Sequence, residues 1–317
     1  MSAAVLLDRV TKRFGKHKAL DDVSLKVPRG VVFAMLGENG AGKTTAIKLL
    51  LGLASPDEGR TEVLGLSSRN SGPEIRRQIG YVSERPALYE WMTAAEIGWF
   101  TAGFYSDGFE QRYLQQLEKY TVPYQRKISQ MSKGMRAKVP LSLALAHQPQ
   151  LLILDEPTSG LDTLVRREFL ESMVDIAAEG RTVLLSSHLI GEVERVADIV
   201  AIMREGRLLL VESLDALKCQ TRELTITLAT RASAPPHFAG QVLASRRRSR
   251  QLQILVRHLD DSDIDALRNH RSVVAVEIRT PGLEEIFVAY MRADQQSDGL
   301  AVSGHLETTA TATLSSF

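Results

Sequence analysis

The 317-residue sequence contains a single cysteine, Cys219, so no disulfide can form within the chain. A lone cysteine suits a reducing compartment. No apolar run approaches the length of about eighteen residues that a membrane-spanning helix requires. The formal net charge is only +1, which gives no strong positive field to attract nucleic acid. These absences exclude a disulfide-stabilised scaffold and a helical membrane channel, and we expect no nucleic-acid partner.

The remaining composition is that of an ordinary globular protein. Hydrophobic residues make up 44% of the chain and charged residues 24%, both close to the averages for soluble domains. The length is sufficient for one sizeable hydrophobic core and a second, smaller domain. Function therefore has to be inferred from motifs.

The most specific motif is a phosphate-binding loop. Residues 37–44 read GENGAGKT, a complete match to the pattern G-x-x-x-x-G-K-[ST]. An apolar run at 31–36 precedes it and a helical pattern at 45–51 follows, which is the strand, loop and helix context that the motif requires. Its glycines let backbone amides turn towards phosphate oxygens, and the helix N-terminus favours the anion. The expected ATP-binding residues are Gly37, Glu38, Asn39, Gly40, Ala41, Gly42, Lys43, Thr44 and Thr45.

A pair of carboxylates ends a second predicted strand. Residues 151–154 are all apolar, and Asp155 and Glu156 follow them directly. Parallel α/β sheets bind their ligands at the carboxyl ends of strands. We expect Asp155 to coordinate Mg²⁺ together with the Thr44 hydroxyl, and Glu156 to activate the attacking water as general base.

Together with three further features, these motifs resemble the ATP-binding subunit of an ABC transporter of the exporter-type (ABC-2-like) branch. The further features are Phe14, the segment 131–135 (MSKGM) and His188, and all occur in the family's order over about residues 3–220. The resemblance implies an α/β fold: a P-loop NTPase ABC ATPase core with an antiparallel β layer and a helical subdomain, followed by a small C-terminal α/β appendage.

The expected domain boundaries follow from this resemblance and from the apolar pattern. Residues 1–220 form the ATPase domain, with the helical subdomain at about 85–145. Alternating apolar residues predict an α/β appendage over 221–292. Residues 293–317, rich in Ser, Thr, Ala and Gln, are predicted to be a disordered tail.

The resemblance also implies roles for isolated residues. His188 stands where the family's catalytic histidine contacts the γ-phosphate. Phe14 occupies the position of the aromatic that stacks on adenine, although packing in the core is the alternative. Glu84 replaces the glutamine that the family usually has, and its carboxylate is a candidate Mg²⁺ ligand. Ser186, Ser187 and His188 do not indicate a serine hydrolase, because the chain has no G-x-S-x-G elbow.

The segment 131–135 resembles the family's signature loop, in which Ser132 and Gly134 are retained and Lys133 replaces a glycine. By resemblance, Ser132, Lys133 and Gly134 bind the nucleotide of a second copy, so ATP lies at the interface of a head-to-tail homodimer. The alternative is an ordinary helix start. Pro140 falls inside the helix that should follow and is expected to kink it, or to cost about 3 kcal/mol.

Two further segments indicate partners. Residues 85–93 are rich in apolar and aromatic side chains, and in the family this region receives a coupling helix of the membrane subunit. Tyr89, Trp91 and Met92 are the expected contacts with polytopic membrane permease subunits, with packing inside the helical subdomain as the alternative.

The arginine-rich run at 246–250 is predicted to be a solvated hairpin turn, with contact to anionic lipid or a regulatory partner as the alternative.

The function predicted from the sequence is that of a Mg²⁺-dependent ATPase subunit of an ABC transporter, an exporter, peripheral on the cytoplasmic face of the cell membrane. Its cofactors would be ATP and Mg²⁺. One alternative is a soluble ABC ATPase acting on the ribosome or DNA. Another is a nucleotide-gated regulator with little turnover, since Lys133, Met135 and Pro140 depart from the family pattern.

Overall fold

The computed structural model describes residues 3–105, 107–231, 233 and 239–292. Contacts divide the chain into two compact units, residues 1–211 and 212–317. The division precedes the boundary predicted at residue 220, because the helix that begins at Leu214 belongs to the second unit. The predicted tail at 293–317 lies outside the described residues.

A six-stranded sheet with the order β10-β9-β3-β8-β7-β6 forms the centre of the first unit. Strands β3, β9, β8, β7 and β6 pair in parallel. All residues of β3 and β7 are buried, as expected for parallel strands covered on both faces. The strands are β3 (Val32–Leu36), β6 (Ile79–Val82), β7 (Leu151–Asp155), β8 (Thr182–Ser187), β9 (Ile199–Arg204) and β10 (Arg207–Ser213).

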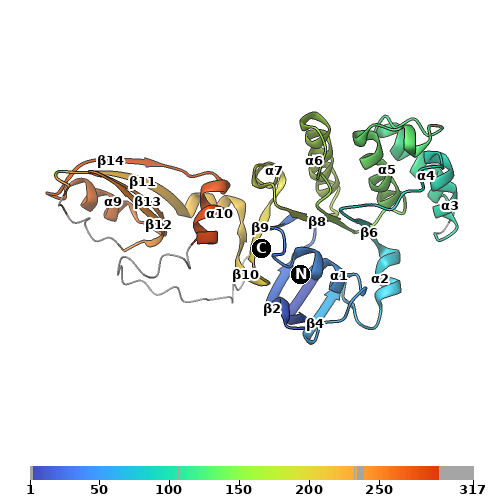
Figure 1. Ribbon diagram of the computed structural model, residues 1–317, viewed down its shortest axis with the longest axis horizontal. Helices are drawn as coiled ribbons and strands as arrows, with labels where there is room; N and C mark the ends of the chain where they lie inside the picture. Colours follow the sequence, from blue (N-terminus) through green and yellow to red (C-terminus); the bar gives the residue numbers. More distant parts are fainter. Residues whose placement is uncertain (1–2, 106, 232, 234–238, 293–317) are drawn as a thin grey trace. The chain divides into compact units, whose positions relative to one another are not determined.

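An antiparallel sheet with the order β2-β1-β4-β5 forms a second layer of this unit. Helix α1 (Lys43–Leu50) packs between the two sheets through one shared hydrophobic core. Helices α6 (Thr163–Ala178) and α7 (Ile190–Val196) lie on the opposite face of the parallel sheet (Figure 1). The strands of the second layer are β1 (Val5–Phe14), β2 (His17–Val27), β4 (Glu58–Val63) and β5 (Leu66–Ser67).

The segment between β6 and β7 is helical and has its own core. Tyr113 is fully buried there, and its hydroxyl donates a hydrogen bond to Ala94 O at 2.9 Å. Thr93 and Glu96 form a reciprocal capping box that starts α3. Helix α5 continues through Pro140, so the proline does not end it. The helices are α3 (Ala94–Ala102), α4 (Phe109–Lys119), the 3₁₀ turn η1 (Ile128–Gln130) and α5 (Lys133–Ala146), while α2 (Gly72–Gln78) precedes β6.

The second unit is an antiparallel sheet with the order β12-β13-β11-β14. Leu267 of α9 packs into the apolar face of this sheet. Its elements are α8 (Leu214–Gln220), β11 (Thr221–Leu228), β12 (Gln241–Arg248), β13 (Gln251–Arg257), α9 (Asp261–Arg268), β14 (Val273–Arg279) and α10 (Leu283–Arg292). Throughout the described part of the chain, no helix is long and apolar enough to cross a membrane.

Candidate functional site

The phosphate-binding loop lies between the end of β3 and the start of α1. Gly42 is the residue that precedes α1 and has a φ of 104°, which only glycine adopts without strain. A Cβ atom at Gly42 would lie 2.6 Å from Ala19 O. No side chain caps the first amides of α1, so those amides are available to an anion.

Lys43 is buried, and its side chain is held against the backbone of this loop. Its Nζ donates hydrogen bonds to Gly37 O at 2.6 Å and to Glu38 O at 3.3 Å. The same Nζ lies 3.2 Å from Glu156 Oε1. The lysine therefore forms an ion pair with the carboxylate that the sequence predicts to be the general base.

Asp155 ends strand β7, and its carboxylate accepts hydrogen bonds from two hydroxyl groups. Thr44 Oγ1 donates to Asp155 Oδ1 at 3.1 Å, and Ser186 Oγ donates to the same oxygen at 2.6 Å. A hydroxyl and a carboxylate oxygen that converge beside a phosphate loop are the hard ligands that Mg²⁺ prefers. Thr44 and Asp155 therefore fit a magnesium ion bound together with nucleotide phosphates.

Glu156 follows Asp155 with a φ of 49°, a conformation that is uncommon for a residue with a side chain. Its amide donates to Ser186 O at 3.2 Å and to Ser186 Oγ at 3.1 Å. Its Oε2 accepts from the His188 amide at 3.3 Å and lies 2.7 Å from His188 Nδ1. The structure thus brings Lys43, Glu156 and His188 together in one cluster at the carboxyl ends of β7 and β8, with Lys43 and Glu156 buried and His188 exposed.

The other predicted site residues lie apart from this cluster. Phe14 is exposed at the end of β1, with Lys12 Nζ 5.5 Å from its ring centroid, so core packing does not account for it. The Glu84 side chain is 47% exposed and lies 3.9 Å from Arg85. Among the described residues, no hydrogen bond or ion pair joins either side chain to the phosphate loop.

The signature-like segment begins helix α5. Ser132 Oγ accepts a hydrogen bond from the Met135 amide at 3.2 Å, so Ser132 is the N-cap. Ser132 and Lys133 are exposed, and Gly134 is buried. A Cβ at Gly134 would lie 2.8 Å from Val165 Cγ2 of α6, so glycine is required by packing there.

Ser186 is a site residue that sequence reasoning missed. It is fully buried, and its hydroxyl connects Asp155 Oδ1 with the Glu156 amide. The available signal was a pair of serines, Ser186 and Ser187, that follows the apolar residues 183–185 and directly precedes His188. Its neighbour in the sheet is Asp155 itself, which the sequence alone does not reveal.

We expect Ser186→Ala to lower the free energy of unfolding by about 1–3 kcal/mol, because a buried hydroxyl partner of Asp155 is lost. It should also slow ATP turnover, since the Asp155 carboxylate and the Glu156 backbone amide each lose a hydrogen bond. Urea unfolding and phosphate release measure the two effects. The control is Ser172→Ala, which removes a buried serine hydroxyl bonded to Phe169 O in α6. Equal turnover in the two variants would contradict a positioning role for Ser186.

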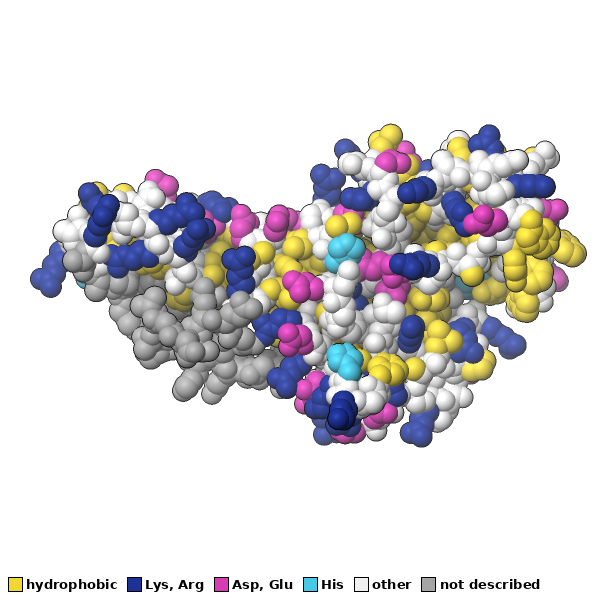
Figure 2. Space-filling view, in the orientation of Figure 1, with side chains coloured by type: hydrophobic (Ala, Val, Ile, Leu, Met, Phe, Trp, Pro, Cys, Tyr) yellow, Lys and Arg dark blue, Asp and Glu magenta, His cyan; other side chains and the backbone are white. Residues whose placement is uncertain are grey.

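An aromatic surface lies on the helical segment. Tyr89, Trp91, Phe100 and Phe104 are exposed, and we call these four the aromatic ridge. Successive ring centroids lie 6.1, 6.0 and 5.8 Å apart for Trp91–Tyr89, Tyr89–Phe100 and Phe100–Phe104. Figure 2 shows hydrophobic side chains gathered over the α3 end of the first unit. Met92 is buried in the helical core instead, so its prediction as a partner contact is wrong.

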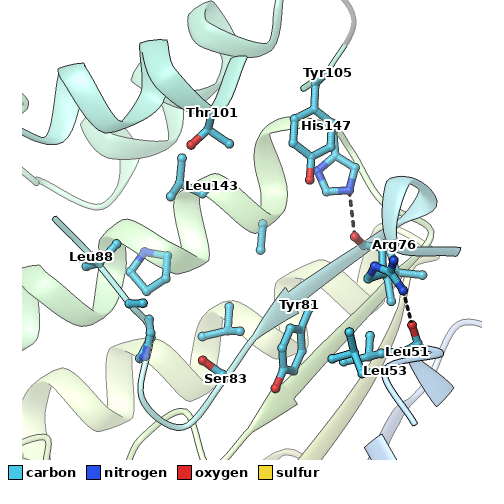
Figure 3. A pocket seen from close by; sticks show the side chains of 16 residues that line it. Leu51, Leu53, Arg76, Tyr81, Ser83, Leu88, Thr101, Tyr105, Leu143 and His147 are labelled. Carbon is cyan, nitrogen blue, oxygen red and sulfur yellow. Dashed lines mark hydrogen bonds between the residues drawn. The ribbon is translucent and has the colours of Figure 1, made fainter. Parts of the chain in front are cut away.

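A groove of about 360 Å³ lies beside this ridge, between the helical segment and the parallel sheet (Figure 3). His147 Nε2 lies 3.0 Å from Ile79 O in its wall, and burial lowers the pKa of His147. Burial and the charge of Asp155 raise the pKa of Tyr81 to about 12. Tyr81 lines the groove, and its hydroxyl stays protonated at neutral pH. The groove is lined by Leu51, Leu53, Arg76, Ile79, Tyr81, Val82, Ser83, Pro86, Ala87, Leu88, Thr101, Tyr105, Pro140, Leu143, Ala144 and His147.

Comparison with known proteins gives consistent matches. Residues 20–159 match the protein family described as ABC transporter. The bacitracin transport ATP-binding protein BcrA of Bacillus licheniformis is 35% identical over 226 residues, which cover 70% of this chain and 74% of that protein. The daunorubicin resistance ATP-binding protein DrrA3 of Streptomyces coeruleorubidus is 31% identical over 306 residues, which cover 90% and 95%.

Solved structures agree with the sequence matches. An ATP-binding subunit of an ABC transporter has a TM-score of 0.62 at 32% identity, covering 68% of this chain and 92% of that one. A dimeric ATP-binding cassette in a post-hydrolysis state with ADP and phosphate has a TM-score of 0.61 at 25% identity, covering 66% and 98%.

Proposed function

Because the chain belongs to the family of ABC transporter ATP-binding subunits, we propose that it hydrolyses ATP in a Mg²⁺-dependent reaction and couples hydrolysis to transport by membrane subunits. Membership of this family implies that the chain binds and hydrolyses ATP. The cluster of Lys43, Glu156 and His188 supports the remaining chemistry, because it places a base, a cation and an imidazole at one phosphate site.

The geometry supports a specific division of roles. Lys43 Nζ, now 3.2 Å from Glu156 Oε1, would move to the β- and γ-phosphates when ATP enters. This leaves the Glu156 carboxylate free to accept a proton from water, while His188 fixes its second oxygen. Thr44 and Asp155 would hold Mg²⁺, which neutralises phosphate charge when bound. Phe14, exposed at the end of β1, is the proposed platform for adenine.

We propose the same dimeric arrangement that the resemblance implies. Ser132, Lys133 and Gly134 of one copy would contact the nucleotide held by the phosphate loop of a second copy. The exposed N-terminus of α5 supports this role, because its first amides and the Lys133 side chain both favour an anion. The dimeric form of the related cassette supports it as well.

The proposed direction of transport is export, on the cytoplasmic face of the membrane. BcrA is a bacitracin transport protein and DrrA3 a daunorubicin resistance protein, and these names support export. We propose that the membrane subunits dock on the aromatic ridge and in the adjoining groove. Exposed aromatic side chains in tilted and edge-to-face contact beside a largely apolar groove favour such a partner.

Replacing Tyr89 and Trp91 by serine tests the docking surface. We expect the double variant to lose co-purification with its polytopic membrane subunits from detergent-solubilised membranes, because it loses two exposed aromatic anchors. Its basal ATPase rate should not change, since neither side chain contacts the phosphate cluster.

The matched control is Tyr124→Ser, which removes another exposed aromatic of the same helical segment. This variant should retain its membrane partners. Full co-purification of the Tyr89 and Trp91 variant would place the docking surface elsewhere. Recovery of the unaltered chain only with ribosomal or DNA-repair proteins would favour a soluble ABC ATPase and contradict the transport function.

A further inference from the structure

Three connections meet at one end of the sheet in the second unit. The β12–β13 turn is joined to β11 by a hydrogen bond from the Leu228 amide to Arg250 O at 2.8 Å. The α9–β14 connection is joined to β11 by a hydrogen bond from the Ala229 amide to Ser272 O, also at 2.8 Å. The segment that leaves β11 is fixed by Arg247, whose Nη2 donates to Arg231 O at 2.7 Å and to Ser233 O at 3.0 Å.

This end of the sheet is uniformly cationic, and we call its six side chains the arginine end. They are Arg231, Arg246, Arg247, Arg248, Arg250 and Arg271. All six are exposed, and they come from all three connections and from the adjoining end of β12. In Figure 2, dark blue side chains gather over this end of the second unit.

No carboxylate compensates these charges among the described residues. The described positions of the three connections contain no Asp or Glu. Arg268, at the end of α9, is paired with Asp265 at 3.6 Å and is therefore left out of the set. Of the other acidic residues of α9, Asp261 and Asp263 lie in its first turn, at the opposite end of the helix. Positive charge is thus concentrated at one end of the sheet, where six arginines have no carboxylate partner among the described residues.

Some of these guanidinium groups are anchored and some are free to meet a ligand. Arg231 Nε donates to Ser249 Oγ at 2.9 Å, and Arg250 Nε donates to Leu228 O at 2.9 Å. Arg246 and Arg248 pair in register with Gln253 and Gln251 of β13, whose side chains are exposed. Arg246 and Arg248 therefore project from the same polar face of the sheet, two residues apart.

We propose that the arginine end binds the headgroups of anionic phospholipids. Clusters of basic residues attract acidic membrane surfaces, and six arginines with no carboxylate partner form such a cluster. The described part of this end carries no Phe, Tyr or Trp on which nucleotide bases could stack, so it lacks the usual platform for single-stranded nucleic acid. The choice of a membrane over another polyanion rests on the proposed function at a membrane.

Vesicle sedimentation with the full chain tests this proposal without ATP and without membrane subunits. The vesicles are phosphatidylcholine alone, or phosphatidylcholine with added phosphatidylglycerol. We expect the unaltered chain to bind the anionic vesicles preferentially and salt to weaken that binding. Changing Arg246, Arg248 and Arg271 to glutamine should weaken it at least about tenfold, because each basic residue near an acidic surface contributes severalfold.

The control variant changes Arg9, Arg60 and Arg167 to glutamine. It loses the same net charge, but each of these arginines lies within 4 Å of a carboxylate. Control binding close to that of the unaltered chain supports the proposal. Equal loss in both variants, no preference for anionic vesicles, or binding to RNA alone would each overturn it. ATPase activity is measured separately, so failure here is distinguishable from failure of the proposed function.

Discussion

Glu156→Gln is expected to reduce ATP turnover by about 10²–10⁴-fold, the usual contribution of a general base, while ATP binding persists. Glutamine keeps the size of the side chain but cannot take a proton from water. The substitution also removes the carboxylate that lies 3.2 Å from Lys43 Nζ. Because Lys43 is then released from its ion pair, ATP should bind at least as tightly as before.

Three measurements check this prediction. Phosphate release measures turnover, a nucleotide-binding assay measures ATP affinity, and size-exclusion chromatography with ATP and Mg²⁺ measures the oligomeric state. The variant should elute as a stable dimer with ATP, since bound nucleotide is no longer consumed. Glu84→Gln is the matched control, because Glu84 is exposed and pairs with Arg85, outside the cluster of Lys43, Glu156 and His188. It should retain turnover and alter only the dependence on Mg²⁺ concentration.

Unchanged turnover in Glu156→Gln would show that another group activates the water. If instead the unaltered chain binds ATP but releases no phosphate above background, the nucleotide-gated regulator becomes the better description. The proximity of Lys43, Glu156 and His188 argues against that alternative, because an ATP-binding regulator needs no base at this position.

Local motifs carried most of what the sequence could predict. The phosphate loop was recognisable because its strand, glycines and helix are contiguous, and the comparisons confirm the family and the α/β fold that it indicated. Asp155 and Glu156 were recognisable because they directly follow a wholly apolar strand. The roles assigned to individual residues stay predictions until variants are measured.

Features that depend on packing between distant segments could not be predicted from the sequence. Ser186 contacts Asp155 only because β8 lies beside β7. Met92 was assigned to the surface with Tyr89 and Trp91, yet the turn before α3 directs it into the helical core. Pro140 lies inside α5 and lines the groove; the kink or energetic cost expected of it stays a prediction. In each case tertiary contacts decided where a side chain lies.

A second substitution with a large expected effect lies in the signature-like segment. We propose that this segment contacts the nucleotide bound to another copy of the chain. Ser132→Asp should abolish most ATP turnover by placing a carboxylate against the γ-phosphate. Ser132→Asn is the matched control, since Asp and Asn are equally good N-caps and the hydrogen bond from the Met135 amide can be kept. The two variants should have the same thermal stability, so that any difference in turnover arises from charge.

Mixing two inactive variants then tests whether the sites are shared between copies. In a head-to-tail dimer of Lys43→Met with Ser132→Asp, one site combines both defects and the other has neither. Random assembly makes about half of the dimers mixed, so turnover should recover to about one quarter of the unaltered rate if the sites act independently. No recovery is expected if Ser132 acts on the phosphate loop of its own chain, because every site then carries one defect. Co-purification of an untagged variant with a tagged one must confirm that the two variants exchange subunits. Recovery in the mixture, with each variant inactive alone, is the outcome that a shared nucleotide site requires.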